Sequence, residues 1–326
     1  MRNKWRKALM VIIGATLILV ACGDDGDKKD DPTTKKYKVG VTQIVEHPSL
    51  DAAYGGFKQA LEDAGLDVEY DVNNAQNDQS ANTSIAQKLV NSEVDLIFAN
   101  STPSAQAAAS ATQDVPIIFT SVTDPVGAEL VESLEKPGGN LTGTIDLHPE
   151  VIPNTLKFLK EELGAKNVGI VYNSGEQNAR VQADKVNELA KDMGLTIFEA
   201  TISTSAEVKQ ATESLVGKID SFYIIKDNTV VSALESVIEV AVANQLPMMV
   251  GELDSVKRGG LAAYGFEYFD LGYQTGELAV EILKEGNEPA SLPVQTPQSL
   301  TFEVNEETAE KIGIEIKEEW QTEVSE

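Results

Sequence analysis

Residues 95–122 read DLIFANSTPSAQAAASATQDVPIIFTSV, and this stretch predicts the fold class. It begins and ends with apolar runs of strand length, at 95–99 and 116–122, and a helix of small residues is expected between them at 103–112. A strand, a helix and a second strand in direct succession form a unit with parallel strands. Strands that are apolar throughout are typical of a parallel sheet that helices cover on both faces.

The same alternation extends in both directions from this stretch. A first series of strands is expected at 38–44, 68–72, 95–99, 116–122 and 141–146, with helices at 49–64, 78–90 and 103–112. A second series has strands at 167–172, 195–202, 221–225 and 248–251, with helices at 151–163, 178–193, 206–216 and 230–244. A chain of 326 residues is long enough for two domains. We therefore expect an α/β fold of two doubly wound parallel-sheet lobes.

The C-terminal part adds elements that a simple two-domain chain would not need. These are strands at 260–267 and 300–304 and helices at 271–283 and 306–312. We expect the chain to return to the first lobe and to cross again, which makes a hinge of several strands. The expected division is 37–146 plus 254–290 for the first lobe, 147–253 plus 291–320 for the second, and a tail at 321–326.

The N-terminus has the pattern of an export signal. Basic residues from Arg2 to Lys7 precede an apolar run at 8–20, which is shorter than the roughly 20 residues of a membrane-spanning helix. An uncleaved anchor is therefore disfavoured, and residues 1–21 are predicted to be a signal peptide. Cys22 is the only cysteine, so the chain has no internal disulfide. The charged segment 22–36 is expected to be a disordered tether.

The stretch Leu19-Val20-Ala21-Cys22 resembles the lipobox of bacterial lipoproteins. This resemblance implies cleavage before Cys22 and lipidation of that residue. Two or three acyl chains would hold the protein firmly to a membrane. We therefore expect it to act outside the cytoplasmic membrane, anchored by lipid.

Composition excludes several classes of function. The net charge of −26 repels nucleic acid and anionic lipid. With His47 and His148 as the only histidines, few ligands remain for zinc or copper, and we expect no metal or cofactor. The sequence lacks a nucleophile elbow, a phosphate loop, an HExxH motif and a dinucleotide fingerprint, so no enzyme is predicted.

Short motifs along nearly the whole mature chain resemble those of one family. They are Val39-Gly40-Val41, His47-Pro48-Ser49-Leu50-Asp51, Asn100-Ser101-Thr102-Pro103-Ser104-Ala105, Thr123-Asp124-Pro125-Val126, Asn140-Leu141-Thr142-Gly143, Asp227-Asn228-Thr229, Tyr264-Gly265 and Leu271-Gly272-Tyr273-Gln274-Thr275-Gly276. In order and spacing the chain is similar to ABC-transporter substrate-binding lipoproteins of the tryptophan/tyrosine-binding type, which have the type I periplasmic-binding-protein fold.

That resemblance implies a monomer that captures a small amino-acid-like ligand, aromatic in most members, and delivers it to an ABC permease and its ATPase. Two alternatives stay open. The chain could be a surface-exposed ligand sensor or adhesin with the same fold, or it could bind a small molecule that is not an amino acid. A cytoplasmic repressor of this fold is excluded by the export signal and the acidic charge.

Ligands of open parallel sheets bind beyond the carboxyl ends of the strands. In the first lobe this rule selects Gln43, Ser101, Thr102, Thr123 and Asp124. Ser101 and Thr102 also begin a helix, so they fit an anion site for a ligand carboxylate. The alternative, which is compatible, is that one of them only caps the helix.

In the second lobe the same rule selects Asn173, Asp227, Asn228 and Glu252. A buried ligand ammonium needs a carboxylate partner, for which Asp227 is the first choice and Glu252 and Asp124 are rivals. Tyr264, and also Tyr54 and Tyr172, are candidates for a wall against an aromatic ligand, with core packing as the alternative. His47 is either a ligand contact or only the start of a helix.

Overall fold

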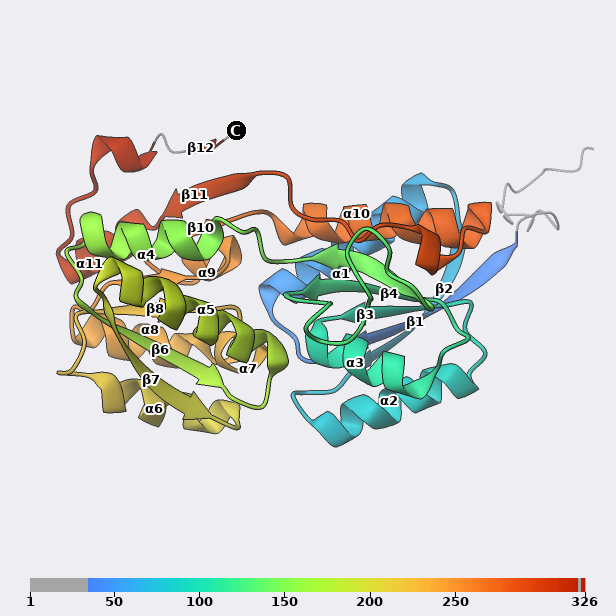
Figure 1. The fold of residues 1–326 in the computed structure, drawn as a ribbon, viewed down its shortest axis with the longest axis horizontal. Helices are drawn as coiled ribbons and strands as arrows, with labels where there is room; N and C mark the ends of the chain where they lie inside the picture. Colours follow the sequence, from blue (N-terminus) through green and yellow to red (C-terminus); the bar gives the residue numbers. More distant parts are fainter. Residues whose placement is uncertain (1–34, 322–323, 326) are drawn as a thin grey trace, which may run out of the picture. The chain divides into compact units, whose positions relative to one another are not determined.

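The computed structural model describes residues 35–321 and 324–325, and it contains two mainly parallel sheets in two lobes (Figure 1). The predicted α/β class is therefore confirmed. The predicted signal peptide, Cys22 and the tether up to residue 34 lie outside the described residues. Within the described ranges, no helix combines the length and the apolar character needed to cross a membrane.

The first sheet has five parallel strands in the order β2-β1-β3-β4-β5. These strands are β1 (Lys36–Gln43), β2 (Asp67–Asn74), β3 (Leu96–Asn100), β4 (Ile117–Val122) and β5 (Leu141–Ile145). Four helices belong to this lobe, namely α1 (Pro48–Asp63), α2 (Gln79–Asn91), α3 (Thr102–Ala111) and α10 (Tyr268–Val280).

Strand β3 shows how the apolar pattern forms two cores. Successive side chains of a strand point to opposite faces. Leu96 and Phe98 pack into the cluster that α1 and α10 cover, whereas Ile97 and Ala99 pack into the cluster on the side of α2 and α3. All four side chains are fully buried. The uninterrupted apolar run that predicted a doubly covered sheet therefore supplies both of its faces.

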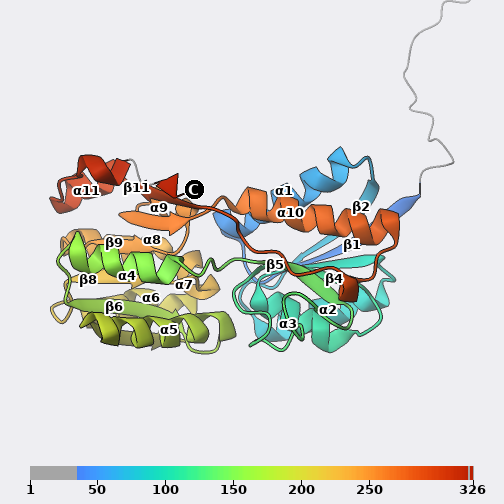
Figure 2. The same cartoon turned by 45° about the horizontal axis from the view of Figure 1, so that its top comes forward.

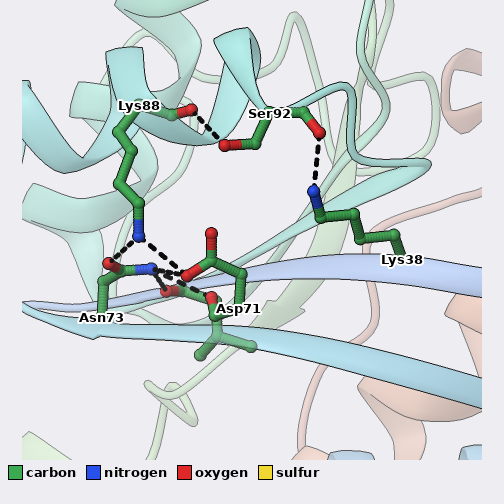
Figure 3. A network of polar contacts seen from close by, with 6 residues as sticks. Lys38, Asp71, Asn73, Lys88 and Ser92 are labelled. Carbon is green, nitrogen blue, oxygen red and sulfur yellow. Dashed lines mark hydrogen bonds and ion pairs between the residues drawn. The ribbon is translucent and has the colours of Figure 1, made fainter.

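Helix α2 and the residue after it are tied to β1 and β2 of this sheet by a polar network near the surface (Figure 3). The Lys88 ammonium donates to Asp71 Oδ1 and Asn73 Oδ1, each at 2.9 Å, and Lys38 Nζ donates to the Ser92 carbonyl at 2.8 Å. Exposed ion pairs of this kind contribute about 0–1 kcal/mol, so the network orients the helix more than it stabilises the lobe.

The second sheet repeats the strand order of the first and extends it. Strands β7-β6-β8-β9-β10 are parallel neighbours, β11 is antiparallel to β10, and β12 is antiparallel to β11. The strands are β6 (Asn167–Asn173), β7 (Thr196–Ile202), β8 (Ser221–Ile224), β9 (Met248–Val250), β10 (Ala262–Gly265), β11 (Leu300–Val304) and β12 (Val324–Ser325).

The helices of the second lobe flank this sheet. They are α4 (Val151–Glu161), α5 (Gln177–Met193), α6 (Val208–Leu215), α7 (Asn228–Ser232), α8 (Leu234–Ala243), α9 (Leu253–Lys257) and α11 (Glu306–Ile312). Short 3-10 or π turns lie at η1 (Ser205–Glu207), η2 (Glu281–Glu285), η3 (Pro289–Ser291) and η4 (Glu318–Gln321). The single helix expected at 230–244 is wrong in extent, since α7 and α8 divide at Ala233, where φ is −120° and ψ is 26°.

The chain crosses between the lobes three times: after β5, between β10 and α10, and before β11. Helix α10 lies along α1 of the first lobe (Figure 2). The division expected for 254–290 needs correction, because α9 and β10 belong to the second lobe and only the part from α10 onward joins the first. The start of 291–320 also belongs to the first lobe. Leu292 and Val294 pack into the clusters of that lobe, and Gln295 forms a β-bridge with Thr144. A short buried strand has an apolar pattern that fits either sheet, so its sequence alone does not show which partner it pairs with.

Candidate functional site

A small polar cavity lies where the two lobes meet. Its lining side chains come from both lobes and from the crossing segments: His47, Leu50, Ser121, Thr123, Asp146, Asn178, Lys226, Asp227, Asn228, Glu252 and Tyr268. The centre of a water molecule can move within only about 10 Å³ of this cavity. The cavity therefore has room for about one water. The cavity is therefore almost closed by its own side chains.

Direct contacts hold the lobes together around this cavity. The Ser49 hydroxyl at the start of α1 donates to Glu252 Oε2 in the second lobe. Farther out, Asn77 Nδ2 donates to Ser232 Oγ at 3.2 Å. Each contact joins one side chain from each lobe, so opening the lobes breaks both.

One polar network connects two of the crossing segments with the second lobe. Thr123 Oγ1 donates to Asp146 Oδ1 at 3.0 Å, and the Tyr268 hydroxyl donates to Asp146 Oδ2 at 2.8 Å. The Lys226 ammonium in turn donates to the Tyr268 hydroxyl at 3.1 Å. Asp146 directly follows β5 and Tyr268 begins α10, so this chain of hydrogen bonds spans the hinge.

Three buried polar atoms around the cavity have no hydrogen-bond partner among the described residues. They are His47 Nδ1, Ser121 Oγ and Asn178 Oδ1. Ser121 also has a positive φ of 57°, which is uncommon for a residue other than glycine. An unpaired buried polar group costs about 1–3 kcal/mol. Such atoms around one cavity, together with local backbone strain, indicate a site that is completed by a polar ligand.

The titratable groups of the cavity are strongly shifted by their surroundings. Burial raises the pKa of the Glu252 carboxyl to about 7, against the opposing effect of the Lys226 ammonium. Burial lowers the pKa of the His47 imidazole to about 4 and also lowers the pKa of Lys226. Perturbed groups that gather in an inter-lobe cavity are typical of a functional site.

Asp227 and Asn228 line the cavity, but their polar groups are used within the second lobe. Asp227 Oδ1 accepts from the Val230 amide at 2.8 Å, and its Oδ2 accepts from the Asn173 amide at 2.6 Å. Asn228 donates from its side chain to Glu176 Oε2 at 2.6 Å. Asp227 therefore caps α7 and positions the end of β6.

Of the residues selected from the sequence, the structure brings Thr123, Asp227, Asn228 and Glu252 to the central cavity. Asn173 lines a separate polar opening of about 460 Å³ between the lobes. Asp124 accepts from the Gly127 amide at 2.9 Å and borders, with Thr123, an apolar groove of about 520 Å³.

The remaining selected residues lie away from the cavity. Gln43 donates to Asp51 and accepts from Asn100 inside the first lobe. Ser101 caps α3 with its hydroxyl, 3.4 Å from the Ser104 amide, and Thr102 is buried next to it. The ring of Tyr264 packs 4.5 Å from that of Phe302 in the core of the second lobe.

Asp146, Lys226 and Tyr268 also line the cavity, although none of them was selected from the sequence. Asp146 and Lys226 each follow closely on the carboxyl end of a strand, so the rule that selected the other candidates also applies to them. Tyr268 begins a helix after a crossing between the lobes, and no local signal indicates that it points to the cavity. His47, which was left open between two roles, lines the cavity and also precedes α1.

Comparison with known proteins places these features in one family. The model of the ABC transporter substrate-binding protein family matches residues 38–326. The chain is 44% identical over 326 residues to the tyrosine-binding protein of Clostridioides difficile strain R20291, covering 96% of this chain and 94% of that protein.

Two solved structures differ in how closely they match this chain. The L-Trp complex of an ABC domain from Streptococcus pneumonia has a TM-score of 0.85 at 33% identity, covering 89% of this chain and 99% of that one. The ligand-free, open structure of a substrate-binding protein with adhesive properties from Clostridium difficile has a TM-score of only 0.65 at 44% identity, covering 86% and 96%. The tryptophan complex thus matches this chain more closely in structure, although the ligand-free, open structure is more similar in sequence. By its sequence, its two lobes and the site between them, the chain belongs to the ABC transporter substrate-binding protein family.

Proposed function

We propose that this substrate-binding protein captures an aromatic amino acid between its lobes and delivers it to the permease and ATPase of an ABC importer. One observation carries the proposal: the cavity between the lobes contains both a buried ammonium, of Lys226, and a buried carboxyl, of Glu252. A zwitterionic ligand needs one charge of each sign, because unpaired buried charges are costly. The names of the two relatives, tyrosine-binding and tryptophan-bound, support the aromatic class.

Among the acidic residues, Glu252 is the best partner for the ligand ammonium. Both carboxylate oxygens of Asp227 already accept backbone N–H groups, and those of Asp146 accept from Thr123 and Tyr268. Asp124 borders the groove instead of the central cavity. Glu252 accepts a hydrogen bond from Ser49 of the other lobe. A ligand ammonium would replace the Ser49 hydroxyl as the donor to Glu252. This choice replaces Asp227, the first candidate from the sequence.

An apolar groove provides a place for the aromatic side chain. It shares Thr123 with the central cavity. Its apolar side chains come from both lobes and the segment between them, and they include Leu134, Ile145, Leu147, Ile152 and Val181. Its volume of about 520 Å³ is within the range of small-molecule sites. Burial of an aromatic ring there would add an apolar contribution to the charged pairs.

Binding in this site requires the lobes to move. The closed cavity has room for about one water, so an amino acid enters only when the Ser49–Glu252 contact has opened. A ligand that bonds to both lobes then favours closure by its greater affinity for the closed form. The closed form is the one that we expect to dock on the permease.

A thermal-shift screen of the purified protein against the twenty amino acids, nucleosides and sugars tests this proposal. Tyrosine or tryptophan at a hundred times its dissociation constant is expected to stabilise the fold by about 2.7 kcal/mol. Glucose and ribose serve as controls and should leave the melting temperature unchanged. The ligand should be recovered chemically unchanged, since no turnover is proposed. Stabilisation by a sugar or nucleoside alone would refute the amino-acid assignment.

We also propose that the mature protein is a lipoprotein attached to the outer face of the cytoplasmic membrane or to another extracytoplasmic membrane surface through Cys22. The support is in the sequence: a basic start, an apolar run of limited length and the lipobox-like Leu19-Val20-Ala21-Cys22. The acyl chains would keep the binding lobes near the permease.

Cys22→Ala is expected to abolish incorporation of radiolabelled palmitate completely, because the chain has no other cysteine to carry the thioether. Incorporation is read from the immunoprecipitated full-length chain, with a neighbouring Gly23→Ala variant as the matched control. Separation of membrane and soluble fractions would discriminate less well, because a chain with an uncleaved signal peptide also stays with the membrane. Palmitate labelling that persists in Cys22→Ala would overturn the lipoprotein assignment.

A second candidate function follows from the relative that is described as having adhesive properties. A surface adhesin with this fold could use the same chain without changing its ligand site. Attachment of beads coated with the protein to epithelial cells, with and without tyrosine, measures this role directly. If these beads attach no more than beads coated with albumin, the adhesin role is excluded.

A further inference from the structure

Lys226 is a buried cation whose position is fixed by its own backbone. It follows β8, and its amide donates to Gln182 Oε1 at 3.1 Å, while its carbonyl accepts from Gln182 Nε2 at 2.8 Å and from Asn178 Nδ2 at 3.2 Å. The residue is only 4% exposed, and it lines the central cavity. The backbone contacts explain why the loop holds this residue in place, but they do not use its ammonium.

The ammonium itself has no direct ion-pair partner, although the more distant Asp146 and Glu252 carboxyl groups favour its charge. In the part of the chain that the structure describes, no carboxylate lies within the 4.0 Å of an ion pair. Its partners are the Tyr268 hydroxyl at 3.1 Å and the faces of the Phe266 and Tyr268 rings, whose centroids lie at 4.5 and 5.0 Å. An ammonium has three donors, and a buried cation needs an anion or several acceptors to remain charged. Lys226 therefore has capacity for a further acceptor.

The surroundings of Lys226 favour an anionic group over a neutral one. Ser121 Oγ lines the same cavity without a hydrogen-bond partner. A carboxylate has two oxygens, so it can accept from the Lys226 ammonium with one and from a hydroxyl with the other. By contrast, the anion site expected at Ser101 and Thr102 lies outside the cavity, and the Ser101 hydroxyl is used as a helix cap.

We propose that Lys226 binds the α-carboxylate of the ligand, and that Glu252, which lines the same cavity, binds its ammonium. This inference rests on the proposed function and deepens it, because it makes the free carboxylate a condition of recognition. An amino acid with a blocked carboxyl group, or a residue within a peptide, would be rejected at Lys226.

The test compares L-tyrosine with L-tyrosinamide, which lacks the negative charge, by calorimetry on the full-length protein in detergent. The wild-type protein should prefer tyrosine. Lys226→Met keeps most of the apolar stem, and it should weaken tyrosine binding about 30-fold or more while it changes tyrosinamide binding less than about threefold. The variant should thus lose its preference for the acid.

Glu252→Gln is the matched control. At about pH 6, below the pKa of an α-amino group next to an amide, the acid and the amide both carry the ammonium. This substitution should therefore weaken both equally and preserve the ratio of their affinities. Lys226→Gln is a second variant in case Lys226→Met does not fold, and it too should reduce the preference for the acid. A wild-type acid-to-amide ratio in either lysine variant would overturn the proposal. If the wild-type protein binds no amino acid at all, the proposed function itself fails, which is a different result.

Discussion

Gly56→Ala is expected to destabilise the protein by about 3 kcal/mol or more, at the upper end of what a single added methyl group does. A Cβ at Gly56 would lie 1.9 Å from the Phe269 carbonyl oxygen and 2.7 Å from the Tyr273 amide nitrogen. Both atoms belong to the backbone of α10, so no side chain can move aside. The two helices would have to separate along their most extensive contact, and α10 would lose its place on the first sheet.

The neighbouring glycine provides an internal control for this prediction. A Cβ at Gly55 would meet only the Phe269 ring, at ordinary contact distances of 3.8 Å to Cδ2 and 3.9 Å to Cε2. Since alanine is a better helix former than glycine by about 0.8–1.0 kcal/mol, Gly55→Ala should be neutral or slightly stabilising. Urea unfolding of both variants measures the difference. Equal effects at the two positions would show that α1 and α10 are not in close backbone contact.

Removing either of two buried titratable groups should change how stability depends on pH. Burial raises the pKa of Glu252 to about 7, with the Lys226 charge and the Ser49 hydroxyl acting against it and Asp146 and Asp254 adding to it. Between its unfolded pKa near 4.5 and this value, the folded state holds the extra proton. A rise in pH through this window therefore lowers the free energy of unfolding.

His47 acts in the opposite direction. Burial, helped by the Arg258 charge, lowers its pKa from 6.5 to about 4, although Asp51, Glu176 and Asp254 oppose this shift. Between these two values the unfolded state holds the extra proton, so a rise in pH increases the free energy of unfolding. In the wild-type protein the two contributions therefore oppose each other between pH 4.5 and 6.5.

The variants Glu252→Gln and His47→Asn separate the two contributions. From pH 4.5 to 6.5, the stability of Glu252→Gln should rise relative to wild type by roughly 2–3 kcal/mol, and that of His47→Asn should fall by a similar amount. Denaturant unfolding without ligand at the two pH values gives both differences, and groups common to all three proteins cancel. Parallel pH profiles for the three proteins would mean that neither side chain is buried as the structure shows.

The local elements could be predicted because their signals lie within a few residues of one another. The runs at 95–99 and 116–122 are apolar throughout, as buried parallel strands require, and both became strands of the first sheet. The placement of β10 could not be predicted in the same way. Its four residues fit either sheet, and they joined the second one because β9 and β11 pair with them there.

In the candidate site, too, some features could be predicted from local sequence and others could not. The rule on strand ends led to Thr123, Asp227, Asn228 and Glu252 at the cavity. It could not show that both carboxylate oxygens of Asp227 accept backbone amides, because such hydrogen bonds are not visible in a sequence. It also could not place Tyr268, which meets Asp146 from 122 positions away.

By itself, the sequence determined the α/β class, the order of most elements and the set of polar residues at the strand ends, since periodicity and turn chemistry depend on near neighbours in the chain. Only the tertiary structure decided which of those residues face one another. Ser49 and Glu252 are 203 positions apart, and they meet because the two lobes lie against each other. Convergence of this kind depends on packing between lobes, which no local pattern of residues encodes.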